Sequence, residues 1–160
     1  MRRPAHYCRR AVGLEEQSYT TEVAASPADC YAVITDFSSY PRWSSAVSVA
    51  EVRQHHPDGA AKQVQMELDI KIRRIRYVLE YHHEPPTRLT WSLVEGDVKA
   101  VQGSYVFEEA GQDRTQITCT QAVDIGFWVP GFLKSMFERQ ALKDSVEEFK
   151  HEVEARQSRG

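Results

Sequence analysis

Alternation of apolar and polar residues dominates the middle of the chain. Between residues 64 and 72, every even position is apolar and every odd position is polar or charged. A period of two predicts a strand with one buried face and one wet face. Weaker runs of the same kind cover residues 47–52, 75–81, 89–93, 98–108 and 117–125.

Turn-forming sequences separate these runs, at His56-Pro57-Asp58-Gly59, Arg73-Arg74, Pro85-Pro86, Glu95-Gly96-Asp97 and Gly111-Gln112-Asp113. An edge-like strand from about Gln17 to Ala25 precedes them. Short loops favour antiparallel neighbours, so these strands are predicted to form a mostly antiparallel sheet. Gly103, inside the sixth strand, predicts a bulge or a bend in a curved sheet.

Two short helical segments follow the first strand. Ser26-Pro27 supplies an N-cap and a first-turn proline, and the helix is expected to end near Asp36. The segment from Phe37 to Trp43 is predicted to form a second helical turn or a tight loop. Tyr40 precedes a proline, which disfavours a helical conformation at that tyrosine.

A long amphipathic helix is predicted from about Pro130 to Glu154. Its apolar positions recur at steps of three, four or six, with Arg139 in the gap: Phe132, Met136, Leu142, Val146, Phe149 and Val153. This pattern indicates one face against a sheet. A curved sheet wrapped around such a helix leaves space between them unless large side chains fill it.

Composition narrows the function classes. The 160 residues suffice for one domain, expected at residues 17–156, and residues 1–16 are interpreted as a disordered leader or a mis-assigned start. A net charge of −3 gives no reason to expect DNA binding. Three cysteines without CxxC spacing indicate reduced thiols in a cytoplasmic protein. No apolar run approaches the length of a membrane span.

The element order and several local sequences resemble the START / polyketide-cyclase / birch-pollen-allergen (SRPBCC) superfamily, in particular its bacterial polyketide cyclase/dehydrase or coenzyme-Q-binding-like branch. The residues that carry the resemblance are Ala28, Tyr31, Val33 and Ile34, Asp36-Phe37, Tyr40-Pro41-Arg42-Trp43, Asp58-Gly59, Gly103-Ser104-Tyr105 and Pro130-Gly131-Phe132-Leu133-Lys134. The resemblance implies an α+β helix-grip fold: a curved seven-stranded antiparallel sheet around the C-terminal helix, two short helices after strand 1, and an internal ligand cavity. Members of this superfamily include lipid and sterol carriers, hormone receptors, aromatase/cyclases and quinone-binding chaperones.

The candidate ligand-binding side chains are those expected on the apolar sheet face, in the loop after the first helix and on the long helix. They are Phe37, Trp43, Met66, Leu68, Tyr77, Leu79, Tyr81, Trp91, Gln102, Tyr105, Phe132, Met136, Arg139 and Gln140. Each can instead be a plain packing residue. Arg139 could anchor an anionic group or could extend to solvent, and Phe37 with Trp43 could gate the cavity or plug it.

Catalytic and metal-binding motifs are not recognisable in the sequence. His55-His56 and His82-His83 are adjacent pairs on strands, so the two rings of each pair point to opposite faces. We therefore expect neither a metal site nor a cofactor, and the catalytic residues of any reaction are unknown.

Three hypotheses follow. The first is a carrier or sequestering domain for an apolar or amphipathic small molecule, such as a lipid, a quinone or a polyketide-like ring system. The second is a polyketide cyclase/dehydratase. The third is a ribosome- or protein-interaction module that uses the basic hairpin of Lys71, Arg73, Arg74 and Arg76. A transient membrane contact is a further hypothesis for the cluster Phe127, Trp128, Phe132, Leu133 and Phe137, if that cluster is exposed.

Overall fold

A computed structural model describes residues 14–70 and 73–160. The elements, in chain order, are β1 (Gln17–Val23), α1 (Pro27–Ile34), the 3-10 helix η1 (Phe37–Ser39), α2 (Tyr40–Trp43), β2 (Val47–His55), β3 (Ala61–Asp69), β4 (Arg74–Glu84), β5 (Arg88–Gly96), β6 (Ala100–Glu109), β7 (Thr115–Asp124) and α3 (Gly131–Arg159). No helix in these described ranges is both long and apolar enough to cross a bilayer.

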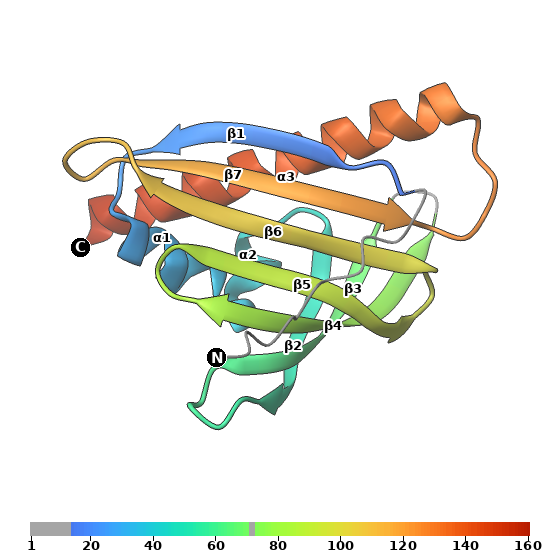
Figure 1. Cartoon of the computed structure of the whole chain (residues 1–160), viewed down its shortest axis with the longest axis horizontal. Helices are drawn as coiled ribbons and strands as arrows, with labels where there is room; N and C mark the ends of the chain where they lie inside the picture. The colour runs from blue at the N-terminus through green and yellow to red at the C-terminus, as the bar shows by residue number, and fades with distance from the viewer. Residues whose placement is uncertain (1–13, 71–72) are drawn as a thin grey trace, which may run out of the picture.

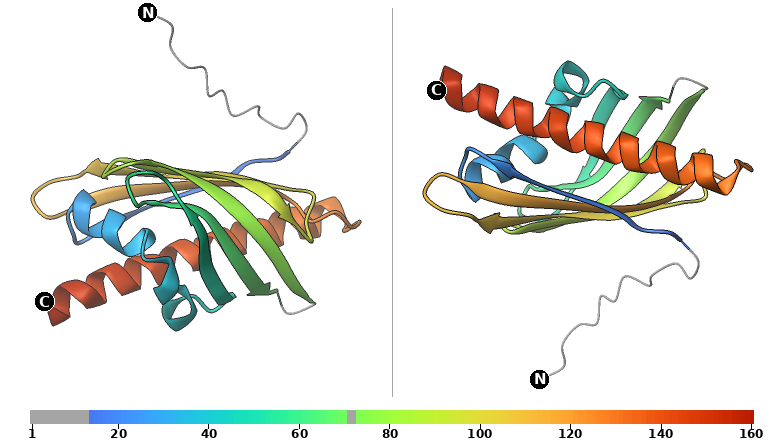
Figure 2. Two further views of the ribbon diagram at one scale, coloured as in Figure 1. Left: turned by 90° about the horizontal axis from the view of Figure 1, so that it is seen from below. Right: turned by 90° about the horizontal axis from the view of Figure 1, so that it is seen from above.

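The seven strands form one antiparallel sheet in the order β1-β7-β6-β5-β4-β3-β2. The sheet is curved, and α3 crosses its concave side (Figures 1 and 2). This is the α+β helix-grip architecture that the sequence resemblance implied. Because side chains alternate along a strand, the register places Tyr81, Trp91, Tyr105 and Cys119 on the same, concave face.

The first helix begins as its sequence predicts. The Ser26 hydroxyl accepts a hydrogen bond from the Asp29 amide at 3.2 Å, and Pro27 occupies the first turn. The expectation for Tyr40 was wrong, because Tyr40 has helical dihedral angles although Pro41 follows it. Its hydroxyl donates to the Ile34 carbonyl at 2.5 Å and its ring packs on Trp43, and these tertiary contacts outweigh the local preference.

The long helix differs from its prediction in two ways. It continues to Arg159, where Glu152 pairs with Arg156 at 3.0 Å in the last turns. Its buried stripe contains only Leu142, Val146, Phe149 and Val153. Phe132 and Met136 are 71% and 64% exposed, which corrects their assignment to the sheet-facing stripe. Met136 precedes Leu142 by six residues, and at 3.6 residues per turn this places it about 120° away around the helix.

Polar contacts fix α3 from both sides. On one side the Tyr19 hydroxyl of β1 donates to Glu147 at 2.5 Å. On the other, Glu148 accepts hydrogen bonds from the backbone amide and hydroxyl of Ser45, at 2.7 and 2.5 Å. Near the C-terminus, Arg156 bridges to Asp36 at 3.1 Å. The second half of α3 is therefore tied both to the edge strand β1 and to the α1–β2 region.

Aromatic rings fill the concave side beneath the second half of α3. Ring centroids are 4.6 Å apart for Phe37 and Tyr81, 6.1 Å for Tyr81 and Trp91, 5.7 Å for Trp91 and Tyr105, and 5.4 Å for Tyr105 and Phe149. Burial of each such side chain contributes about 1.5–3 kcal/mol to folding.

Gly103 does not mark a β-bulge. Its pairings with Trp91 and Gln121 continue in unbroken register, and the irregular pairings lie instead in β2–β3 and at Val78/Leu79 of β4–β5. The reason for a glycine here is the Trp91 ring, which lies across it: a Cβ at Gly103 would meet Trp91 Cζ2 at 2.4 Å and the Thr120 carbonyl at 2.8 Å.

Gly103→Ala is therefore expected to lower the free energy of unfolding by about 1–3 kcal/mol, because the Trp91 ring must leave its position. Urea unfolding measures this change. Gly131→Ala is the matched control, since a Cβ at Gly131 meets nothing within 4 Å. In a Trp91→Phe background the cost of Gly103→Ala should shrink, and an unchanged cost would contradict this explanation.

Candidate functional site

Aromatic side chains fill one end of the concave face, whereas several apolar side chains at the other end, here called the open end, are only partly buried. The first turns of α3 direct no apolar side chain toward the sheet. Their sheet-facing positions, four and seven residues before Leu142, are Glu138 and Ser135. Ser135 hydrogen-bonds Glu15 at 3.2 Å, and Lys134 pairs with Glu138 at 3.6 Å. Apolar side chains near this end are consequently only partly buried: Leu68, Ile70, Tyr77, Leu93, Val123 and Ile125.

Two tyrosine hydroxyls on β4 lack a protein partner within this concave face. Tyr77 and Tyr81 lie four residues apart on one strand, so they share a face. Neither hydroxyl hydrogen-bonds to a residue in the described part of the chain. Yet the described residues contain no fully buried polar side-chain atom without a partner. Both hydroxyls must therefore border space that a water-sized group can reach.

The neighbouring hydroxyls of this interior are satisfied. Tyr40 donates to the backbone carbonyl of Ile34, and the Tyr105 hydroxyl lies close to Cys119 and Ser145. Tyr77, which is partly buried, and Tyr81, which is buried, thus both have hydroxyls that form no hydrogen bond with a described residue.

Burial controls the protonation of these groups. It raises the pKa of both Tyr77 and Tyr81, and for Tyr81 the neighbouring Tyr40, Tyr77 and Cys119 add to the effect. Burial also raises the pKa of the Cys119 thiol to about 12. At neutral pH these groups are uncharged, so each tyrosine can donate a hydrogen bond but none acts as an anionic base.

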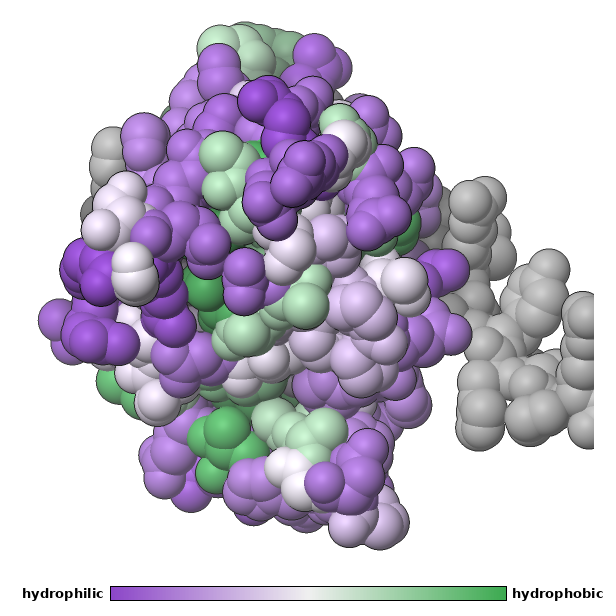
Figure 3. Space-filling view, turned by 90° about the vertical axis from the view of Figure 1, so that its left-hand side faces the viewer, coloured by the Kyte–Doolittle hydropathy of each residue, from purple (hydrophilic) through white to green (hydrophobic). Residues whose placement is uncertain are grey.

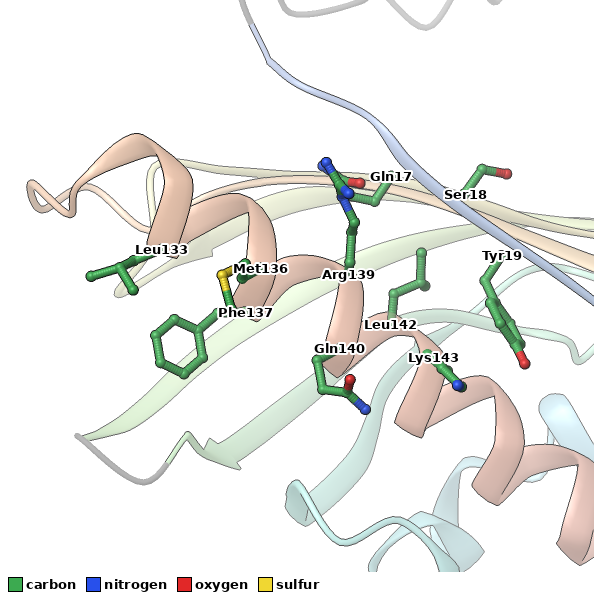
Figure 4. A pocket seen from close by; sticks show the side chains of 10 residues that line it. All are labelled: Gln17, Ser18, Tyr19, Leu133, Met136, Phe137, Arg139, Gln140, Leu142 and Lys143. Atoms are coloured by element: carbon green, nitrogen blue, oxygen red, sulfur yellow. The ribbon is translucent and has the colours of Figure 1, made fainter.

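A second hollow lies at the edge of the molecule, between β1 and the first half of α3 (Figure 4). It has a volume of about 560 Å³. Its lining residues are Gln17, Ser18 and Tyr19 from β1 and Leu133, Met136, Phe137, Arg139, Gln140, Leu142 and Lys143 from α3. The Arg139 side chain points toward Gln17 in this view and forms no ion pair with a described residue.

The candidate residues separate into groups. The concave face and the adjoining short helices bring together Phe37, Trp43, Met66, Leu68, Tyr77, Leu79, Tyr81, Trp91 and Tyr105. Met136, Arg139 and Gln140 line the edge hollow instead. Phe132 lies exposed on α3, and Gln102 lies on the convex face, because it alternates with Val101 and Gly103. The structure therefore does not place Gln102 or Arg139 beside the free tyrosine hydroxyls.

Phe37 and Trp43 are both fixed by packing. Phe37 is 2% exposed. The Trp43 indole donates to the Ser39 hydroxyl at 3.1 Å, and its ring lies 6.1 Å from that of Phe149. Of the two roles that the sequence analysis considered for Phe37 and Trp43, these contacts favour plugging the cavity by packing over gating it.

Two of the histidines, His83 and His56, contact neighbouring strands, and His83 also contacts the first helix. His83 lies 2.9 Å from the Tyr31 hydroxyl through Nδ1 and 2.6 Å from the Ala61 carbonyl through Nε2. His56 Nε2 lies 2.8 Å from the Tyr81 carbonyl. Within residues 14–70 and 73–160, no cluster of His, Cys, Asp and Glu could hold a metal ion.

The basic hairpin is partly engaged in the protein itself. Arg76 donates to the Gln65 side chain at 2.8 Å, and the Arg73 guanidinium stacks over the Phe127 ring at 5.6 Å. Lys71 lies outside the described residues, as does most of the expected leader, residues 1–13.

Sequence reasoning assigned Tyr40 to the segment that carries the family resemblance but gave it no packing role, and it did not single out Cys119. The loose alternation of the last strand hid the position of Cys119 opposite Tyr105. Both become evident only from the strand register and from the docking of α2.

Comparisons with known proteins agree with this geometry. A family model described as "Polyketide cyclase / dehydrase and lipid transport" matches residues 23–150. No protein of curated function matches the chain.

Several solved structures share the fold. A START superfamily protein from Mycobacterium smegmatis has a TM-score of 0.82 at 20% identity, over 88% of this chain and 97% of that chain. The Zhui aromatase/cyclase from Streptomyces sp. R1128 has a TM-score of 0.77 at 16% identity, over 89% of this chain and 95% of that chain. A protein from Thermus thermophilus has a TM-score of 0.76 at 17% identity, over 88% and 98% of the two chains.

The protonation of Cys119 predicts a loss of stability at alkaline pH. The unfolded thiol ionises near its ordinary pKa of 9.0, whereas the folded thiol keeps its proton until about pH 12. The unfolded state therefore binds fewer protons above pH 9, and the free energy of unfolding falls as pH rises, by up to about 1.4 kcal/mol per pH unit for this group. Urea unfolding between pH 7 and 11 should show a shallower fall in Cys119→Ala than in the parent. Thr118→Ala, on the same strand, should leave the slope unchanged, and equal slopes in all three proteins would contradict the assignment.

Proposed function

This chain belongs to the polyketide cyclase / dehydrase and lipid transport family, and we propose from that premise that it binds and carries an apolar small molecule with a hydrogen-bond acceptor at one end. The guest occupies the open end of the concave face, beneath the first turns of α3. Its apolar body packs on Leu68, Leu93 and Val123, which are only partly buried without it. Its acceptor receives hydrogen bonds from Tyr77 and Tyr81.

The two unpartnered tyrosine hydroxyls carry this proposal. A core that only has to pack would use phenylalanine at Tyr77 and Tyr81, since an unpaired hydroxyl in an apolar setting is unfavourable. Because burial raises their pKa values, both groups are neutral donors at physiological pH. Carbonyl, quinone, ether and carboxylic-acid oxygens are the acceptors that match such donors.

Affinity would come mainly from apolar contact. Each 100 Å² of apolar guest surface removed from water contributes about 2.5 kcal/mol before the entropic cost of binding. Two well-placed hydroxyl donors add orientation more than affinity, which is typical of apolar ligand pockets.

The direct experiment is native mass spectrometry of the protein purified from its own host. We expect a bound species of lipid, quinone or polyketide size that dissociates on denaturation. Its extracted mass should correspond to a molecule that contains at least one carbonyl or ether oxygen. Recovery of only the bare chain, together with no uptake of added apolar compounds, would contradict the proposal.

Two neighbouring residues of β5 provide a matched pair of variants. Leu93 is partly buried on the concave face, and Val94 is 46% exposed on the other face. Leu93→Trp should fill the open end and weaken binding of the neutral reporter N-phenyl-1-naphthylamine at least about tenfold. Val94→Trp, with the same bulky replacement, should leave the reporter affinity unchanged. Equal affinities in the two variants would place the guest elsewhere.

One observation favours an enzymatic alternative, a polyketide cyclase or dehydratase. Neutral tyrosine donors in a dry interior can stabilise oxyanion character that develops on a carbonyl oxygen. The protonated thiol of Cys119 and the distant Arg139 do not supply a base at that place. Conversion of a linear poly-β-ketone to a cyclised or dehydrated product, seen by liquid chromatography and mass spectrometry, distinguishes this activity from carriage.

A further inference from the structure

The most apolar exposed surface of the molecule surrounds the start of α3. Six large hydrophobic side chains are exposed within the described residues, and five belong to this region: Phe127 at 36%, Trp128 at 85%, Phe132 at 71%, Met136 at 64% and Phe137 at 70%. We call this group the β7–α3 surface. Such a concentration on one part of a monomer marks an interaction site.

Helix geometry explains why these side chains cannot turn inward. At about 100° per residue, Phe132, Met136 and Phe137 fall within an arc of about 140°. The centre of that arc lies about 140° around the helix from the buried stripe that contains Leu142 and Phe149. In Figure 4, Phe137 and Leu142 project from different sides of α3. The exposed residues thus extend away from the core, and no rotation of α3 buries both sets at once.

Positive charge lies directly behind the apolar tip. Arg139 and Lys143 follow Phe132 by two and three turns of α3, and neither forms an ion pair with a described residue. The Arg73 guanidinium covers one face of the Phe127 ring at 5.6 Å. Two acidic side chains near these cations already have other partners. Glu138 pairs with Lys134 at 3.6 Å, and Asp144 accepts a hydrogen bond from Gln140 at 2.7 Å.

This order of side chains matches the depth profile of a bilayer interface. Phe132 and Arg139 are separated by seven residues, about 10 Å along the helix axis. When an apolar tip enters a membrane by about 5–10 Å, residues at that distance reach the level of the lipid phosphates. Tryptophan prefers the same interfacial zone, and unpaired cations favour anionic headgroups.

The opposite end of the molecule has a different character. Figure 3 shows the end that contains the C-terminus of α3, and its surface is mostly hydrophilic. A second copy of the chain is a poorer partner for the β7–α3 surface, because a twofold contact would bring the cations of two identical faces toward one another.

We propose that the β7–α3 surface docks on the surface of an anionic lipid bilayer, with Trp128, Phe132 and Phe137 inserted and Arg139 and Lys143 at the headgroups. The docking goes beyond the proposed function and does not depend on which guest the interior holds. It would bring the open end of the concave face next to the membrane.

Vesicle flotation of the full chain tests the docking. Vesicles of phosphatidylcholine with about one-third phosphatidylglycerol should bind the protein, and vesicles of phosphatidylcholine alone should bind it at least about tenfold more weakly. The triple variant Trp128→Ser/Phe132→Ser/Phe137→Ser should lose at least about tenfold in partitioning. Val94→Ser removes an exposed apolar side chain outside the surface and should have no effect.

The charge contribution has its own pair of variants. Arg139→Gln/Lys143→Gln should weaken binding to the anionic vesicles and reduce its salt dependence. Arg42→Gln/Lys62→Gln removes the same charge from α2 and β3 and should change binding less. All substituted positions of the docking variants are at the surface, so circular dichroism and the urea midpoint should match those of the parent.

Tryptophan fluorescence gives an independent reading. Trp91 is buried and Trp43 is partly buried against the core, whereas Trp128 is 85% exposed, so a blue shift on addition of vesicles should come mainly from Trp128 and should largely vanish in Trp128→Phe. No flotation with anionic vesicles at low salt would overturn the proposal, as would equal flotation of the parent and the triple variant. A dimer in solution that the triple variant abolishes, without any vesicle binding, would also overturn it. Because no guest is added in these experiments, their failure leaves the carrier function to be judged by mass spectrometry alone.

Discussion

The contact between the second half of α3 and the concave face of the sheet determines the rest of this structure. Leu142, Val146, Phe149 and Val153 form a single buried stripe, and the rings of Tyr105 and Phe107 on β6 pack on Phe149. The stripe ends at Leu142, and the preceding turns present serine and glutamate to the sheet instead. One helix therefore has two parts: its second half completes the core, and its first half leaves several apolar side chains of the sheet only partly buried.

The hydrogen bonding of the interior tyrosine hydroxyls also differs between the two halves of α3. Where α3 packs tightly, the Tyr40 hydroxyl donates to the Ile34 carbonyl, and the Tyr105 hydroxyl lies close to Cys119 and Ser145. Tyr81 lies at the edge of that aromatic cluster and Tyr77 lies beyond it, and neither hydroxyl bonds to a side chain of α3. The interior thus changes from a closely packed aromatic cluster to a region of partly buried apolar side chains. The description of the family that the chain belongs to names both cyclase/dehydrase activity and lipid transport, and a graded interior of this kind is compatible with either chemistry.

The sequence predicted the sheet well because the information is local. Strict alternation from Val64 onward, turn residues between strands and the Ser26-Pro27 helix start each act within a few residues, and all are seen in the structure. The site was predicted less completely, because it depends on the direction in which each side chain leaves α3 and on the pairing register of the strands. In the sequence, Met136 fits the apolar pattern of the helix at a step of six residues from Leu142. On the folded helix, that step turns the Met136 side chain away from the sheet. Gln102 lies on the convex face only because side chains alternate along β6 and its neighbours Val101 and Gly103 face the concave side. The unpaired state of Tyr77 and Tyr81 depends on what α3 does not supply, and no local pattern contains that information.

The position of α3 after the whole sheet also has a consequence for synthesis. All seven strands leave the ribosome before Phe149 and Val153, the side chains that cover the apolar face of the sheet. Until that moment the nascent sheet lacks the helix that shields it, and exposed apolar strands of this kind are prone to aggregate. Because α3 is translated last, the apolar face of the newly made strands stays uncovered during the interval before this helix emerges.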